Sequence, residues 1–94
     1  MIEWTEQASR QLDQIYEYIT ASKSEEVAVR IATQIVSRVE QLANFPLSGR
    51  PGRVPNTREL VISKTPYIAV YTIDDARIVV LAIYHGARRW PASF

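Results

Sequence analysis

The sequence from Thr57 to Tyr84, TRELVISKTPYIAVYTIDDARIVVLAIY, decides the fold class. Its apolar residues alternate with polar ones or run together over short lengths, a pattern typical of β-strands. Three strands are predicted, over residues 57–62, 67–73 and 77–84. Asp74-Asp75-Ala76 predicts a tight hairpin between the last two strands. Because the third strand is apolar almost throughout, we expect it to be central in the sheet and buried on both faces.

A basic loop is predicted just before these strands. Residues 46–56 contain three prolines and two of the three glycines of the chain, a composition typical of a connector without regular structure. The connector also carries Arg50 and Arg53. Since loops on a rigid scaffold often carry function, this one is a candidate for binding.

Two helices and a short strand are predicted further upstream. Ile2-Glu3-Trp4 alternates as a strand does, and Thr5 is a suitable N-cap for the helix that follows. The second helix is expected to begin near Ser24, where Ser22 and Glu25 have the spacing of a capping box, and to stop before Pro46. Both helices carry one apolar stripe with steps of three and four residues, formed by Ala8, Leu12, Ile15, Tyr16 and Ile19 in the first and by Ala28, Ile31, Ile35, Val39 and Leu42 in the second.

The predicted order of elements is β-α-α-β-β-β. Such an order predicts an α+β fold, in which a helical hairpin packs on one face of a mostly antiparallel sheet. The chain has 94 residues, 47% of them hydrophobic, so we expect one domain over residues 1–94.

The composition excludes several classes of site. The chain has no cysteine and one histidine, which excludes disulfides, thiolate nucleophiles and any zinc site with two imidazoles. Glycine loops for nucleotides, a nucleophile elbow and a carboxylate cluster for magnesium are also missing from the sequence. We therefore expect no metal and no cofactor. No apolar run approaches the ~18–20 residues of a membrane span and no secretory signal is evident, so we expect a cytoplasmic protein without a membrane partner.

Charge is distributed unevenly along the chain. Residues 1–45 carry four basic and seven acidic side chains, whereas residues 46–94 carry seven basic and three acidic ones. This asymmetry favours an anionic partner for the C-terminal half, although such a split also falls within ordinary variation for a small domain.

The segment after the third strand concentrates candidate functional groups. His85 is the only side chain with an ordinary pKa near neutrality, and Arg88 and Arg89 can bind phosphate or carboxylate through two hydrogen bonds each. Each group also has a structural alternative. His85 can serve as a hydrogen-bonded structural group, the two arginines can contact an acidic partner segment, and Trp90 and Phe94 can pack the terminus on the domain instead of stacking on bases.

Three segments of the sequence resemble the RelE/ParE superfamily of bacterial toxins: Gly49–Leu60, Tyr67–Tyr71 and Tyr84–Pro91. The opening Trp4-Thr5-Glu6-Gln7-Ala8 and the helical hairpin fit the same superfamily. The resemblance implies the toxin of a type II toxin–antitoxin system, bound to a cognate antitoxin in a hetero-oligomer. RelE-type members cut mRNA in the ribosomal A site without a metal, and ParE-type members poison DNA gyrase.

Two positions make the sequence more similar to the ParE branch. RelE-like sequences usually carry an arginine where this chain has Ile68, and an aromatic hydroxyl near the C-terminus where it has Phe94. The Tyr-Ile-x-x-Tyr form of the middle strand is ParE-like. The resemblance therefore implies a gyrase inhibitor that acts by protein–protein contact, with a target surface that includes Arg88, Arg89, Trp90 and Pro91.

Two alternatives to gyrase inhibition remain open from the sequence. One is a ribosome-dependent mRNA endoribonuclease that uses His85 as acid or base, with Arg88 and Arg58 on the phosphate. The other is a degenerate toxin that only binds its antitoxin. In every case we expect an acidic or amphipathic antitoxin segment that folds on binding, held by residues among Arg53, Arg58, Arg88 and Arg89.

Overall fold

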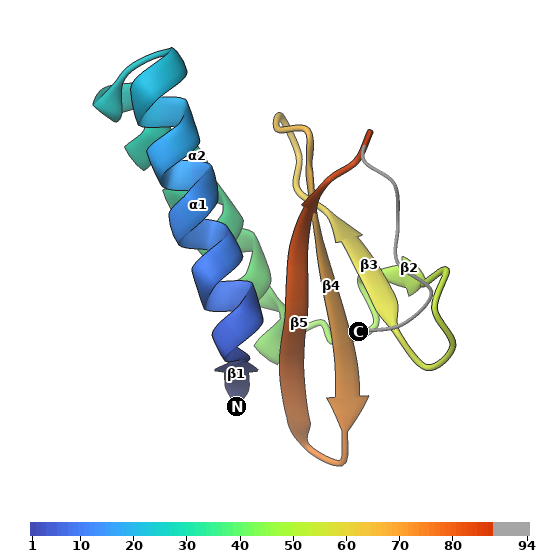
Figure 1. The fold of residues 1–94 in the computed structure, drawn as a ribbon. Helices are drawn as coiled ribbons and strands as arrows, with labels where there is room; N and C mark the ends of the chain where they lie inside the picture. The colour runs from blue at the N-terminus through green and yellow to red at the C-terminus, as the bar shows by residue number, and fades with distance from the viewer. Residues whose placement is uncertain (88–94) are drawn as a thin grey trace.

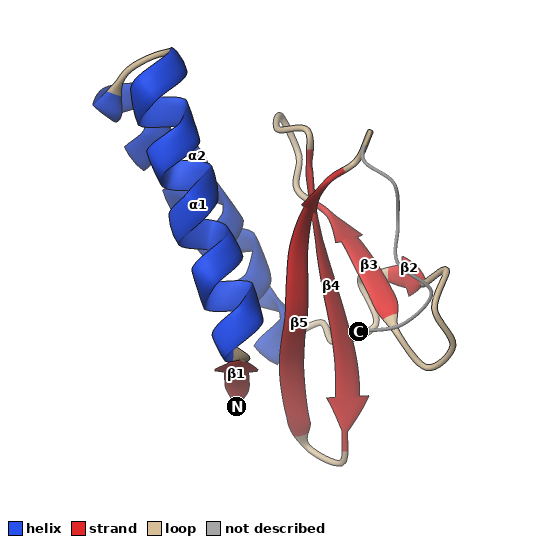
Figure 2. Cartoon of the chain, in the orientation of Figure 1, coloured by secondary structure: helices blue, strands red, loops and turns tan. Residues whose placement is uncertain are grey.

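The computed structural model of the chain describes residues 1–87 and has the predicted α+β fold. A helical hairpin lies along one face of a twisted sheet (Figures 1 and 2). The elements are, in chain order, β1 (Ile2–Trp4), α1 (Glu6–Ser22), α2 (Glu25–Glu40), the 3₁₀ turn η1 (Gln41–Ala43), β2 (Arg50–Pro51), β3 (Arg58–Val61), β4 (Tyr67–Asp74) and β5 (Arg77–His85).

The sheet has the strand order β1-β5-β4-β3-β2. All neighbouring strands are antiparallel except β1 and β5, which pair in parallel with Ile2 opposite Ile78. The helical hairpin forms the crossover between β1 and the rest of the sheet, which brings the N-terminus beside β5 (Figure 1).

The expectation that the third long strand is central and buried on both faces was wrong in part. This strand, β5, does have a neighbour on each side, but the middle strand is β4, which is buried at each position from Tyr67 to Tyr71. In β5, Ile78 and Val80 belong to the core under the helices, whereas Val79 is only half-buried. Successive side chains alternate between the two faces, so Val79 points away from the helical hairpin.

The predicted loop before the sheet contains a strand. Arg50–Pro51 forms β2 at the sheet edge, where Arg50 lies opposite Glu59. Two residues carry no periodicity, so the sequence pattern of this segment gave no indication of a strand.

Each helix begins at a side-chain cap. The hydroxyl of Thr5 accepts a hydrogen bond from the backbone N–H of Ala8 at 3.1 Å, as predicted. At the second helix the cap is Ser24, which accepts from Val27 N–H at 3.1 Å. The expected capping box of Ser22 and Glu25 is not formed, because Ser22 is the last residue of α1 and its hydroxyl donates to the carbonyl of Tyr18.

One apolar core lies between the hairpin and the sheet. Both predicted helical stripes contribute to it, through Ala8 and Ile19 of α1 and through Ala28, Ile35 and Val39 of α2. Among residues 1–87, the largest side chain with no exposed surface is Tyr71 of β4. Within residues 1–87, neither helix is long and apolar enough to cross a membrane.

Candidate functional site

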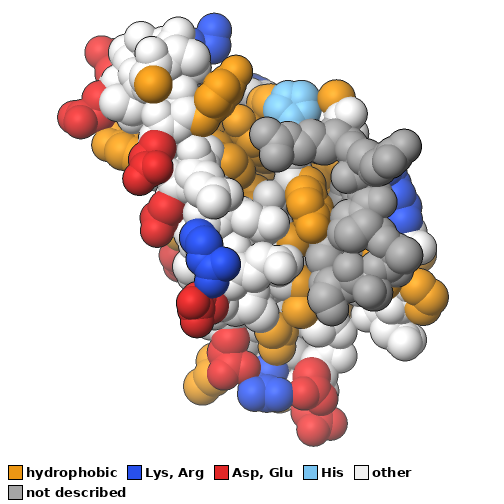
Figure 3. Space-filling view, viewed as in Figure 1, with side chains coloured by type: hydrophobic (Ala, Val, Ile, Leu, Met, Phe, Trp, Pro, Cys, Tyr) orange, Lys and Arg blue, Asp and Glu red, His pale blue; other side chains and the backbone are white. Residues whose placement is uncertain are grey.

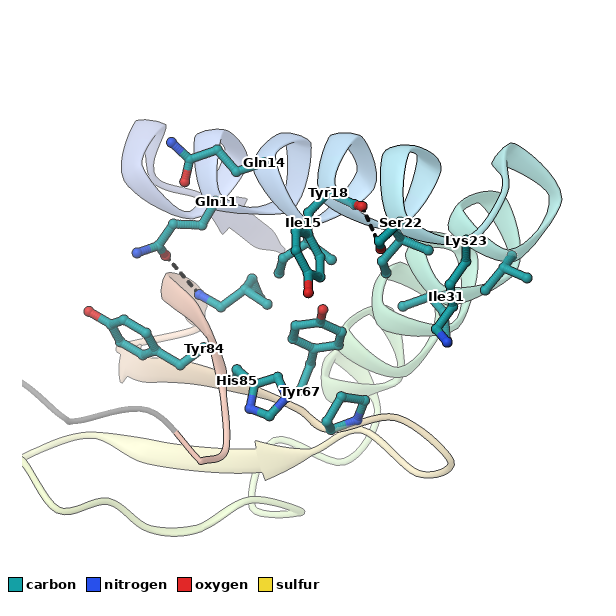
Figure 4. Close-up of a pocket in the computed structure, with 14 residues that line it drawn as sticks. Gln11, Gln14, Ile15, Tyr18, Ser22, Lys23, Ile31, Tyr67, Tyr84 and His85 are labelled. Atoms are coloured by element: carbon teal, nitrogen blue, oxygen red, sulfur yellow. Dashed lines mark hydrogen bonds between the residues drawn. The ribbon is translucent and has the colours of Figure 1, made fainter.

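A groove opens where the helical hairpin and the end of β5 diverge. Its volume is about 680 Å³, and it is lined by the C-terminal two thirds of α1, the start of α2, and the residues from Pro66 to Tyr67 and from Ile83 to His85. The side chains of Tyr18 and Tyr67 point toward each other with their hydroxyl ends (Figure 4). Gln11 fixes one wall, because its side-chain carbonyl accepts a hydrogen bond from the N–H of Ile83 at 2.9 Å.

His85 lies at one end of this groove and is hydrogen-bonded. Its ring contacts the ring of Tyr67 edge to face, with centroids 5.6 Å apart and an interplanar angle of 83°. Its Nδ1 accepts a hydrogen bond from the backbone N–H of Ala87 at 3.1 Å. Since an acceptor nitrogen carries no proton, the neutral ring has its proton on Nε2. The imidazole therefore stabilises the turn that follows β5.

The guanidinium of Arg58 is hydrogen-bonded to the protein backbone. Its Nη1 donates to the carbonyl of Gly49 at 2.7 Å, and the residue is half-buried. In the sheet register Arg58 lies opposite Tyr71, whereas His85 lies opposite Tyr67 on the other side of β4. Tyr67 and Tyr71 are four positions apart on β4, which is about 13 Å along the strand. Arg58 and His85 consequently do not form one cluster.

A buried carboxylate holds the basic loop. Glu59 is 2% exposed, and its Oε1 accepts from Nη2 of Arg50 at 3.0 Å while its Oε2 accepts from the backbone N–H of Arg53 at 2.7 Å. The side chain of Arg53 is on the surface. Glu59 was not among the site residues predicted from the sequence. Its place in a strand opposite a basic loop was the available signal, but the pairing that buries it is visible only in the fold.

The hydroxyl group of Tyr71 binds the backbone of the same loop. Its hydroxyl donates to the carbonyl of Pro46 at 2.7 Å and accepts from the N–H of Gly49 at 2.9 Å. Burial raises the pKa of Tyr71, and this rise is opposed by the Gly49 hydrogen bond and the charge of Arg58. A Cβ on Gly49 would lie 2.7 Å from the Tyr71 ring and 3.0 Å from the Glu59 carbonyl, so only glycine fits there. The Gly-Arg and Thr-Arg-Glu-Leu segments therefore maintain the shape of the loop.

Ile68 occupies an apolar position on β4. It is 7% exposed and lies between Val61 of β3 and Tyr84 of β5 in the register. Ile68 therefore places no positively charged side chain at this position of β4.

The predicted target-contacting residues Arg88, Arg89, Trp90 and Pro91, together with Phe94, lie outside the described residues. Of the other candidates, Arg53, Arg58 and His85 are spread over the loop, β3 and the end of β5. Between residues 1 and 87, no group of three or more His, Asp or Glu side chains is placed to hold a metal ion.

Comparisons with known proteins agree with this architecture. The sequence model of the family described as "ParE toxin of type II toxin-antitoxin system, parDE" matches residues 2–90. A protein of Sinorhizobium fredii named "Putative toxin Y4kP" is 41% identical over 90 residues, which cover 96% of this chain and 92% of that protein. A solved structure described as "Chromosomal ParDE TA system from P. aeruginosa" matches with a TM-score of 0.82 and 29% identity, covering 89% of this chain and 92% of that one.

These matches confirm the predicted superfamily and, within it, the predicted branch. They extend over the helical hairpin and the sheet alike, so they concern the whole described fold. The chain is a member of the ParE toxin family of type II toxin–antitoxin systems.

Proposed function

We propose that this toxin inhibits DNA gyrase by protein–protein contact and stabilises cleaved DNA without performing chemistry of its own. The observation that carries the proposal is the apolar environment of Ile68, at a position where RelE-like nucleases usually carry an arginine. Because gyrase acts on intracellular DNA, we expect the toxin to act in the cytoplasm.

The chemistry of RNA cleavage supports contact over catalysis. Cleavage without a metal needs a base for the 2′-hydroxyl, an acid for the leaving oxygen and cations at the phosphorane. Loss of one such cation costs about 10²–10³ in rate, and loss of an acid or base costs about 10²–10⁴. Among the described residues, His85 and Arg58 are each hydrogen-bonded to backbone and lie on opposite sides of β4. This arrangement favours a protein that acts by binding its target over one that cleaves RNA.

A supercoiling assay with purified gyrase tests the proposal. We expect micromolar toxin to inhibit supercoiling and to accumulate gyrase-cleaved DNA. His85→Ala is the matched variant, because a toxin that acts by contact should keep most of its inhibition when the imidazole is removed. Absence of inhibition by the unmodified toxin at micromolar concentration would refute the proposal.

We also propose that a cognate antitoxin binds the basic half of the chain. The relative from P. aeruginosa is described as part of a ParDE system, and residues 46–94 of this chain carry the excess of arginine. Arg53 is exposed on the loop, whereas Arg58 is half-buried. Of these two, Arg53 is therefore the better candidate for direct contact.

The antitoxin surface can be tested by charge reversal. Arg53→Glu should raise the antitoxin dissociation constant about tenfold, whereas the same change at Arg30, which is exposed on α2, should leave it unchanged. Replacement of Arg88 and Arg89 together should also weaken binding. Calorimetric titration with the antitoxin measures both effects, and equal affinities for all variants would show that the antitoxin binds elsewhere.

A further inference from the structure

The face of the sheet opposite the helical hairpin carries buried apolar side chains. Ile68 is 7% exposed, and Val70 and Ala82 have no exposed surface, yet none of the three belongs to the core between the hairpin and the sheet. Ile68 and Val70 alternate along β4 with side chains of that core, so they lie on the other face of the sheet. Ala82 lies opposite Val70 in the register and shares this face, which we name the outer face.

The outer face is apolar beyond these three residues. On β3, Val61 lies opposite Ile68 and is 47% exposed. On β5, Tyr84 lies opposite Ile68 and is half-buried. The helical hairpin lies on the other side of the sheet, so it cannot bury any of these side chains (Figure 2). Strands that are apolar on both faces are typical of sheets that are covered on both faces. The burial of Val70 and Ala82 therefore calls for a further layer on the outer face.

The chain leaves β5 beside the outer face. Gly86 donates its N–H to the carbonyl of Pro66 at 2.7 Å, and a Cβ on Gly86 would lie 3.4 Å from Cδ1 of Ile68. Gly86 is therefore in contact with an outer-face side chain. From β5 the described chain bends away from the helical hairpin (Figure 1). The residues that follow Ala87 are Arg88-Arg89-Trp90-Pro91-Ala92-Ser93-Phe94.

We infer that residues 88–94 pack on the outer face through Trp90 and Phe94. Seven extended residues reach about 23 Å, whereas Ile68 and Val70 are about 7 Å apart along β4, so the segment is long enough to cross the face. Aromatic side chains bury large apolar areas, which is what the outer face requires. The inference depends on neither gyrase nor the antitoxin as a partner.

Docking of this segment has a consequence for the charged surface. It places Arg88 and Arg89 on the same side of the sheet as Arg50, which pairs with Glu59 opposite Val70. The acidic side chains of the helical hairpin lie on the other side (Figure 3). The outer face is then the side of the molecule that attracts an anionic partner.

The fluorescence of Trp90 tests the docking. Trp4 and Trp90 are the two tryptophans of the chain, so Trp4→Phe leaves Trp90 as the only one. In the folded variant we expect Trp90 to emit at shorter wavelength than in the urea-unfolded chain and to be quenched less by acrylamide. Circular dichroism shows that the variant is folded. Emission and quenching equal to those of the unfolded chain would overturn the inference.

A matched pair of variants in the Trp4→Phe protein tests the place of docking. Val61 is 47% exposed on the outer face, and Val29 is 49% exposed on α2. We expect Val61→Lys to increase the quenching of Trp90, because it puts a hydrated charge beside a segment that already carries two arginines. Val29→Lys should leave the quenching unchanged. Equal quenching in both variants would show that Trp90 is buried elsewhere.

A spin label locates the segment without any change at Trp4. The chain has no cysteine, so Ser93→Cys carries a single label. We expect the label to broaden the amide signals of Val61 and Val70 more than those of Val29 and Ala32 on α2. Broadening on α2 instead, or on neither element, would contradict the docking.

Dilution separates docking within one chain from coverage by a second copy. We expect the protection of Trp90 from acrylamide to be independent of protein concentration. Protection that is lost on dilution would show that another copy of the chain covers the outer face, and the inference would be wrong. Since none of these measurements involves gyrase, their failure would leave the proposed function standing.

Discussion

At Tyr71, one hydroxyl group joins the centre of the sheet to the loop that precedes it. The ring has no exposed surface, and the hydroxyl uses both its donor and its acceptor on the backbone of Pro46 and Gly49. Burial without such partners would be costly. One of the segments that carry the sequence resemblance, from Gly49 to Leu60, is therefore explained in large part by loop geometry.

Removal of this hydroxyl should destabilise the fold. In Tyr71→Phe the Pro46 carbonyl and the Gly49 N–H lose their partner in a buried place, which should lower the free energy of unfolding by about 1–3 kcal/mol. Tyr18→Phe is the matched control, since Tyr18 is 68% exposed and its change should stay within about 0.5 kcal/mol. Urea denaturation measures the free energy of unfolding of both variants. If Tyr71→Phe and Tyr18→Phe were equally stable, the Tyr71 hydroxyl would not contribute to the stability of the fold.

The same tyrosine should make stability depend on alkaline pH. Burial raises the pKa of Tyr71 in the folded state above its ordinary value near 10, so the unfolded chain loses this proton first as the pH rises. The stability that Tyr71 contributes is complete below about pH 10 and is lost as the pH rises through the folded pKa. The stability difference between the wild-type chain and Tyr71→Phe should therefore shrink above about pH 10. A difference that is constant from pH 8 to pH 11 would contradict this.

Gly49 should not tolerate a side chain. Gly49→Ala places a Cβ 2.7 Å from the ring of Tyr71, and the displacement of the loop should cost about 1–3 kcal/mol of unfolding free energy. At Gly86 the nearest atom would be 3.3 Å from the new Cβ, so Gly86→Ala should cost clearly less. Thermal denaturation of the two variants gives the comparison, and a Gly49→Ala protein as stable as Gly86→Ala would show that the loop can move freely.

At the scale of elements, the sequence predicted the helices and strands whose apolar residues form a recognisable pattern. The helical stripes follow from which helix faces are buried, and the short apolar runs of β3 and β4 follow from burial of adjacent residues on both faces, so those elements were confirmed. The strand β2 could not be found, because its two residues are extended only through pairing with Glu59 and its neighbour on β3. The same long-range pairing buries Glu59, and this is why its role in holding the loop was not predicted from the sequence.

The helix boundary between α1 and α2 gives a direct test of element geometry. Ser24→Ala removes the cap that accepts from Val27 N–H and should cost about 1 kcal/mol of unfolding free energy. Ser22→Ala should change stability by less than about 0.5 kcal/mol, because Ser22 ends the preceding helix and donates only to the Tyr18 carbonyl. If Ser22→Ala proved the more damaging change in a chemical denaturation series, the capping box of Ser22 and Glu25 that the sequence predicts would be formed after all.

At the scale of the whole molecule, the candidate surfaces lie apart. Acidic side chains follow the helical hairpin (Figure 3), the groove opens beside His85, and the basic loop lies beyond the far end of α2. The sequence predicted this charge division but not the groove, because a concave surface depends on how the hairpin and the sheet diverge. Separate surfaces fit a protein that binds two partners, its antitoxin and its target.

The most direct test of the account compares both possible activities with one preparation of toxin. The toxin is added in parallel to gyrase with supercoiled DNA and to a translation reaction in which mRNA 5′ ends are mapped. We expect gyrase-cleaved DNA to accumulate while the transcripts stay intact. Transcripts cut in phase with codons, with cuts that vanish in His85→Ala and no effect on gyrase, would contradict it.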